Sequence, residues 1–70
     1  MDIYVRLLDE GTDVLRPVKA RQIREGVFEI AAFADYASLE EQWQFPPGSL
    51  VKCMIETHGD KQIFVAQERM

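Results

Sequence analysis

The sequence predicts an all-β protein, a small five-stranded antiparallel barrel of the SH3-like type with one short helical or 3₁₀ segment; an OB-like barrel is the alternative. The chain has 70 residues, a length that suits a single small domain spanning residues 1–70. Apolar and polar residues alternate with a period of two in several short segments, as in strands with one buried face. Gly and Pro, which favour tight turns, separate these segments.

The first two strands are predicted over Asp2–Leu8 and Asp13–Arg24. In the first, apolar residues stand at every second position from Ile3 onward. The segment between them, Asp9–Thr12, suits a hairpin turn because its glycine can adopt the positive φ that a short loop requires. Pro17 has no backbone N–H to donate, so the second strand is expected to lie at an edge or to bend there.

Three further strands are predicted over Val27–Ala31, Leu50–Thr57 and Lys61–Glu68. A turn at Glu25-Gly26 precedes the first of them, and a hairpin turn at His58-Gly59-Asp60 joins the other two. The last strand has a fully apolar centre, which is typical of a strand buried on both faces. The alternation assigns to the core Phe28, Ile30, Val51, Cys53 and Ile55.

The stretch between the third and fourth predicted strands changes its period. Tyr36 and Trp43 are seven residues apart and, with an apolar residue between them, they share one face of a helix. Ser38 followed by Glu41 matches a capping box, in which the two side chains satisfy free amides at the start of a helix. We therefore expect a short helix or one 3₁₀ turn within Ala34–Gln44.

Two segments of the chain resemble a family of short bacterial proteins of unknown function. They are Glu10–Val18, with the sequence E-G-T-D-V-L-R-P-V, and Trp43–Cys53, with the sequence W-Q-F-P-P-G-S-L-V-K-C, and they cover 20 of the 70 residues. The resemblance implies a stand-alone small β-barrel. It implies no activity, cofactor or catalytic residue.

The composition argues against export and against membrane insertion. One cysteine cannot form an internal disulfide, which small secreted domains commonly need. The N-terminal segment carries an acid where a signal peptide has bases, and no stretch approaches the ~20 apolar residues that cross a bilayer. We expect a cytoplasmic protein with no membrane partner.

Catalysis and cofactor binding are not expected. His58 is the only histidine and stands in a predicted turn, while Cys53 faces inward on a strand, where a free thiol behaves as a small apolar residue. One Cys and one His cannot supply a tetrahedral zinc site. Asp9, Glu10 and Asp13, around the first turn, are expected to be solvated rather than to hold a cation. We therefore predict a protein that is not an enzyme and uses no metal or cofactor.

The predicted function is binding to a partner protein that the sequence does not identify. Tyr36, Trp43 and Phe45, next to the Pro46-Pro47-Gly48 turn, form a candidate aromatic patch of the kind with which SH3-like barrels hold extended peptides. Aromatic residues and arginine also dominate the binding energy of interfaces. A second interpretation stays open, in which Trp43 and Phe45 cover an open end of the barrel.

Four bases and no acid lie between Arg16 and Arg24, although the whole chain has a net charge of −4. This basic strand makes single-stranded nucleic acid the alternative partner, less favoured because the acidic remainder of the surface repels the polymer. Pairing of the basic strand with the acidic segment Asp35–Glu41 of a second copy would give a homo-oligomer. The candidate interaction residues are Arg16, Lys19, Arg21, Arg24, Tyr36, Trp43 and Phe45.

Overall fold

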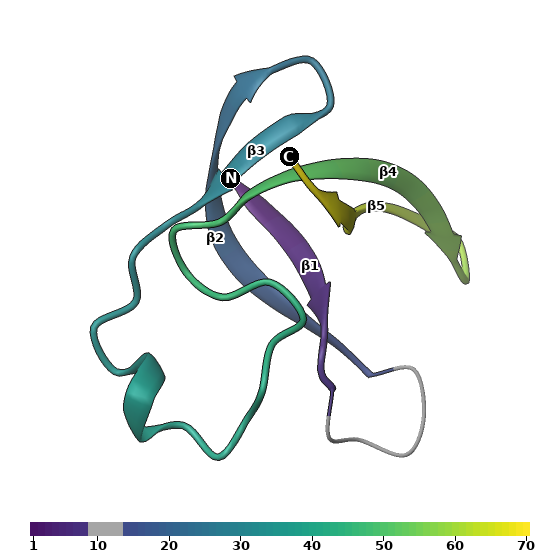
Figure 1. Cartoon of the computed structure of the whole chain (residues 1–70). Coiled ribbons are helices and arrows are strands. Elements are labelled where there is room, and N and C mark those ends of the chain that lie inside the picture. The colour runs from purple at the N-terminus through teal and green to yellow at the C-terminus, as the bar shows by residue number, and fades with distance from the viewer. Residues whose placement is uncertain (9–13) are drawn as a thin grey trace.

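The computed structural model describes residues 1–8 and 14–70, and the strands of this part form a closed barrel (Figure 1). The prediction of a small all-β barrel of five antiparallel strands is confirmed. The predicted turn at Asp9–Thr12 and the acidic residues around it lie outside the described residues. The elements are β1 (Asp2–Arg6), β2 (Leu15–Arg24), β3 (Val27–Ile30), the 3₁₀ turn η1 (Tyr36–Ser38), β4 (Leu50–His58) and β5 (Lys61–Arg69).

The strands follow one another around the barrel in chain order, and consecutive strands are antiparallel. A chain that runs up and down in this way leaves its first and fifth strands pointing in the same direction. β1 and β5 therefore close the ring as a parallel pair, at Tyr4 and Val65. This order is a meander and differs from the Greek key of an OB barrel, the alternative that the sequence left open.

The long strand β2 is shared between two neighbours. Its first half, from Leu15 to Lys19, pairs with β1, and its second half pairs with β3 from Ala20 onward. Pro17 therefore lies in the half of β2 that pairs on one side only within the described part of the chain. This is the edge position predicted for it, where its missing N–H breaks no ladder.

Two glycines make the predicted hairpin turns. Gly26, between β2 and β3, has a φ of 78°, and Gly59, between β4 and β5, has a φ of 65°. Residues with a side chain rarely adopt these values. The strands pair directly on both sides of Gly59-Asp60. Only the first residue of this two-residue loop has a positive φ, as in a type II′ turn.

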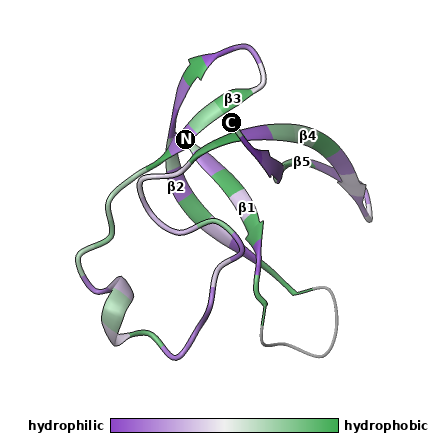
Figure 2. Cartoon of the chain, viewed as in Figure 1, coloured by the Kyte–Doolittle hydropathy of each residue, from purple (hydrophilic) through white to green (hydrophobic). Residues whose placement is uncertain are grey.

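Four of the five residues that the alternation assigns to the core are buried, so their assignment is confirmed. The assignment of Ile55 is wrong, because Ile55 is 58% exposed. Ile55 faces the same side of β4 as Cys53, yet the pairing of β4 with β3 ends at Lys52. Beyond that point the β4–β5 hairpin projects from the barrel, and Figure 2 shows apolar residues on it. The buried cluster consists of Ile3, Val5, Val18, Ala20, Phe28, Ile30, Trp43, Phe45, Val51, Cys53 and Ala66.

η1 confirms the predicted 3₁₀ turn, but the predicted capping box at Ser38 is wrong. Ser38 is the last residue of the turn, and Asp35 at its start makes no side-chain capping hydrogen bond. The turn does not extend into a helix because the chain returns to the barrel. The amide of Leu8 donates to the carbonyl of Gln42 at 2.7 Å, and the amide of Gln44 donates to the end of β1 at 2.8 Å.

Candidate functional site

Trp43 and Phe45 belong to the core, with only 4% and 7% of their surfaces exposed. The backbone of Trp43 forms a bridge with Leu7, and its indole Nε1 donates to Glu41 Oε1 at 3.1 Å. These contacts turn the indole ring inward. The prediction that these two side chains lie on an accessible surface is wrong. The structure agrees with the second interpretation, in which Trp43 and Phe45 cover the interior of the barrel.

The accessible part of the aromatic cluster consists of Tyr36 and Phe33. The ring of Phe33 stacks on Trp43 with centroids 5.9 Å apart and planes at 16°, while Tyr36 meets Trp43 edge-on at 4.8 Å. Phe33 is 37% exposed and Tyr36 is half-buried. Sequence reasoning found Tyr36 and missed Phe33. The available signal is that Phe33 stands alone among alanines at 31–34, which are too small to cover its ring.

Two hollows adjoin Phe33. A cleft of about 150 Å³ lies between residues 16–19 of β2 and residues 31–33, with Trp43 at its base. A wider groove of about 560 Å³ is lined by residues 32–34, Tyr36, Ala37 and residues 46–48, and we call it the aromatic groove. Ala32 and Phe33 line both hollows, so this short segment separates them, and Phe33 is its large side chain.

Carboxylates pair with three of the four predicted interaction bases on β2. The pairs are Arg16 with Glu41 at 3.2 Å, Lys19 with Asp2 at 2.9 Å, and Arg21 with Glu29 at 2.8 Å. Arg24 has no such partner within the described part of the chain. The acids come from β1, β3 and the long loop between β3 and β4 (residues 31–49), so β2 does not present a separate positive stripe.

Cys53 is not placed to act as a nucleophile. Its side chain lies in the core, and burial raises the pKa of its thiol to about 11. The thiolate, which is the reactive form, is therefore scarce at neutral pH. Within residues 1–8 and 14–70, no three His, Cys, Asp or Glu side chains are grouped closely enough to hold a metal ion.

A polar cluster centred on Glu56 joins β1 to the β4–β5 hairpin. His58 Nε2 lies 3.0 Å from Glu56 Oε1, Arg6 contacts Glu56 Oε2 at 3.2 Å, and the amide of Gln67 donates to Glu56 Oε2. The hydrogen bond with His58, followed by those with Arg6 and Gln67, holds the pKa of Glu56 below its ordinary value of 4.5, although desolvation opposes this shift. The cluster therefore favours the ionised carboxylate in the folded state.

We expect the cluster to make folding sensitive to acid. Because the pKa of Glu56 is lower in the folded chain than in the unfolded chain, its contribution is complete at neutral pH and is lost as the pH falls below about 4.5. Urea unfolding at several pH values between about 5 and about 3 measures this loss. Glu56→Gln should make the free energy of unfolding fall less steeply with decreasing pH. Glu68→Gln changes a side chain without an ion pair in the described part, so the fall should be the same as in the unaltered protein. An equal change of the free energy of unfolding with pH in Glu56→Gln and in the unaltered protein would contradict this prediction.

Comparisons with protein-family models, with curated proteins and with solved structures found no match to this chain. Within the described residues, no helix has the length and the apolar character needed to span a bilayer.

Proposed function

We propose that the protein is a non-catalytic cytoplasmic module that binds an extended segment of a partner protein in the aromatic groove. The observation that carries this proposal is the exposed ring of Phe33, which its stacking on buried Trp43 holds between two hollows. A ring that is already fixed in position offers apolar contact area to a ligand at a small cost in side-chain entropy. The single cysteine supports the cytoplasmic location, because small secreted domains commonly depend on disulfides.

The composition of the aromatic groove suits a peptide. Among the described residues, its lining holds two aromatic rings and two prolines and no charged side chain. An extended segment places alternate side chains on one side at intervals of ~7 Å, so neighbouring ones can enter the hollows on both sides of Phe33. Pro46 and Pro47 restrict the backbone of the far wall, which favours a groove that is formed before the ligand binds.

Single-stranded nucleic acid, the alternative partner, has less support. Its affinity depends on bases that are free to neutralise phosphates, and three of the four bases between Arg16 and Arg24 already contact carboxylates. The same ion pairs leave little charge on β2 to attract the acidic segment Asp35–Glu41 of a second copy. Both partners therefore rank below a protein segment.

Replacement of Phe33 by Ala tests the proposal. Random displayed peptides of about 8 residues are selected on the immobilised protein. An extended peptide of this length spans ~27 Å, which is close to the 30 Å length of the fold. We expect Phe33→Ala to weaken the affinity of the protein for the selected peptides about 30-fold, which is the effect of losing one aromatic hot spot. The free energy of unfolding should fall by only about 1 kcal/mol, because the ring is partly exposed.

Met54→Ala is the matched control, since Met54 is an exposed apolar residue on β4 that does not line the groove. Its affinity for the selected peptides should equal that of the unaltered protein. Peptides that bind Phe33→Ala without loss would overturn the proposal. Binding of a single-stranded oligonucleotide that weakens log-linearly with salt, and that Lys19→Glu with Arg21→Glu removes, would favour the alternative instead.

A further inference from the structure

The aromatic groove continues past the Pro46-Pro47-Gly48 turn into a third hollow. This hollow has a volume of about 450 Å³, and its walls are the turn and the start of β4 on one side and Arg69, at the end of β5, with Met70 on the other. Pro47 and Gly48 line both the aromatic groove and this third hollow. An extended ligand that leaves the groove in this direction therefore meets a guanidinium group.

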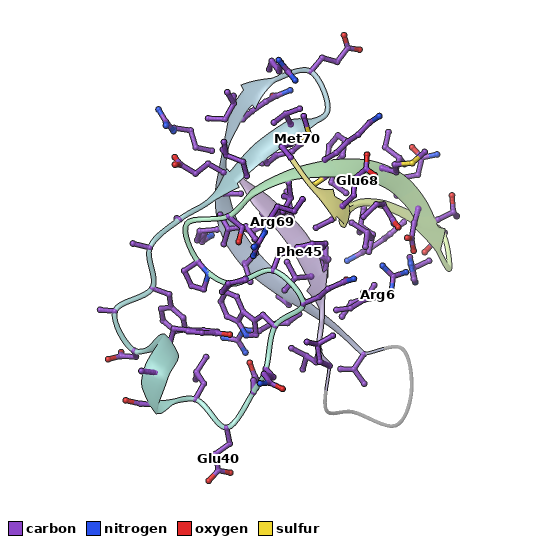
Figure 3. All side chains as sticks on the ribbon, viewed as in Figure 1. Arg6, Glu40, Phe45, Glu68, Arg69 and Met70 are labelled. Carbon is purple, nitrogen blue, oxygen red and sulfur yellow. The ribbon has the colours of Figure 1, made fainter. Side chains whose placement is uncertain are left out.

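Arg69 differs from the arginines of β1 and of the first half of β2 in having no carboxylate partner within the described residues. It donates to Ser49 Oγ at 3.3 Å, and Figure 3 shows its side chain beside the loop that leads into β4. A guanidinium carries five N–H donors. Most of them are thus open to a ligand, and no carboxylate of the residues that the structure describes forms an ion pair with the group.

Ser49 is a second polar residue in the lining of the third hollow, and its backbone is held in place by hydrogen bonds. Ser49 is buried, its amide donates to the carbonyl of Pro46 at 3.1 Å, and its carbonyl accepts from the amide of Ile30 at 2.9 Å. Its hydroxyl accepts from Arg69, which leaves the hydroxyl proton for an acceptor on a ligand. Arg69 and Ser49 together therefore present hydrogen-bond donors to the third hollow.

We propose that the partner segment carries an Asp or Glu side chain, whose carboxylate Arg69 and Ser49 bind while the aromatic groove holds the neighbouring apolar residues. This inference rests on the proposed function. A carboxylate matches the planar donors of arginine and can accept two hydrogen bonds from them. The net charge of −4 repels an acidic segment at long range. The preference for an acidic residue therefore comes from the short contact with Arg69 and Ser49.

Parallel selections with the same random peptides on the unaltered protein, on Arg69→Gln and on Arg24→Gln test this inference. Arg24→Gln is the matched control, because it removes the same charge from an exposed arginine that lies outside all three hollows. We expect an acidic residue at a fixed distance from the apolar residues in peptides selected on the unaltered protein and on Arg24→Gln, but not on Arg69→Gln.

Measured dissociation constants then separate this inference from the proposed function. Changing the acidic residue of a selected peptide to its amide should weaken binding to the unaltered protein about 10-fold, the effect of one charge-assisted contact, and should have no effect on Arg69→Gln. Ser49→Ala should give a smaller loss. Peptides that depend on Phe33 but show no acidic preference would overturn the acidic partner and leave the proposed function standing. If no selected peptide depends on Phe33, both fail.

Discussion

Trp43→Ala is expected to leave much of the protein unfolded at 25 °C. Removal of a buried tryptophan ring costs about 3–5 kcal/mol. Stabilities of ~0.05–0.15 kcal/mol per residue give about 3.5–10 kcal/mol for a chain of 70 residues. The loss is therefore comparable to the lower end of the total. Urea unfolding followed by far-UV circular dichroism measures it, since the substitution removes the only tryptophan.

The effect is large because Trp43 holds the long loop on the barrel from several directions. Its ring contacts Phe33, Tyr36 and the guanidinium of Arg16, whose Cζ lies 5.6 Å from the ring centroid. Trp43→Phe keeps most of the packing and loses the hydrogen bond to Glu41, at a cost of about 1–2 kcal/mol. A cooperative Trp43→Ala variant with an unchanged urea midpoint and lost peptide binding would instead place Trp43 in the binding surface.

The strands and turns were predictable because their signals are local. The period-two alternation predicts a strand over Leu50–Thr57, and the structure has β4 over Leu50–His58. The turns at Gly26 and Gly59 follow from the positive φ that each requires. Both signals lie within a few neighbouring residues, so no knowledge of the rest of the fold is needed to find them.

Burial depends on contacts that alternation does not contain. Alternation places Ile55 and Cys53 on the same face of β4, but only Cys53 has the barrel opposite it. In the same way, the sequence shows four bases and no acid between Arg16 and Arg24. It does not show that acids from β1, β3 and the long loop lie beside three of them. Such pairings appear only when distant segments are placed in space.

The contact between Tyr36 and Trp43 in the candidate site was predictable from the sequence, but the two rings do not meet on a helix. The spacing of Tyr36 and Trp43 predicts that their rings meet on one face of a helix. The rings do meet, 4.8 Å apart, but across a loop whose return segment pairs with the end of β1. Phe33 and Arg69 escaped notice because neither the stacking of Phe33 nor the hollow beside Arg69 has a local signature.

Phe28→Ala is the second substitution expected to destabilise the fold strongly. Phe28 is fully buried and is the largest side chain buried to this extent among the described residues. It lies on β3, which pairs with both β2 and β4, and its ring meets that of Phe64 with centroids 5.4 Å apart. The cavity left by the ring should cost about 3–5 kcal/mol, measured as the shift in the urea midpoint.

Phe28→Leu provides the graded control, because it keeps most of the buried volume and should cost about 1–1.5 kcal/mol. Phe28 lines none of the three hollows. The folded fraction of Phe28→Ala should therefore bind the selected peptides with unchanged affinity, whereas Phe33→Ala should lose affinity and keep most of its stability. Affinity lost in proportion to stability in both variants would mean that the groove is not a separate binding surface. A loss below about 1 kcal/mol for Phe28→Ala would contradict its place at the centre of the core.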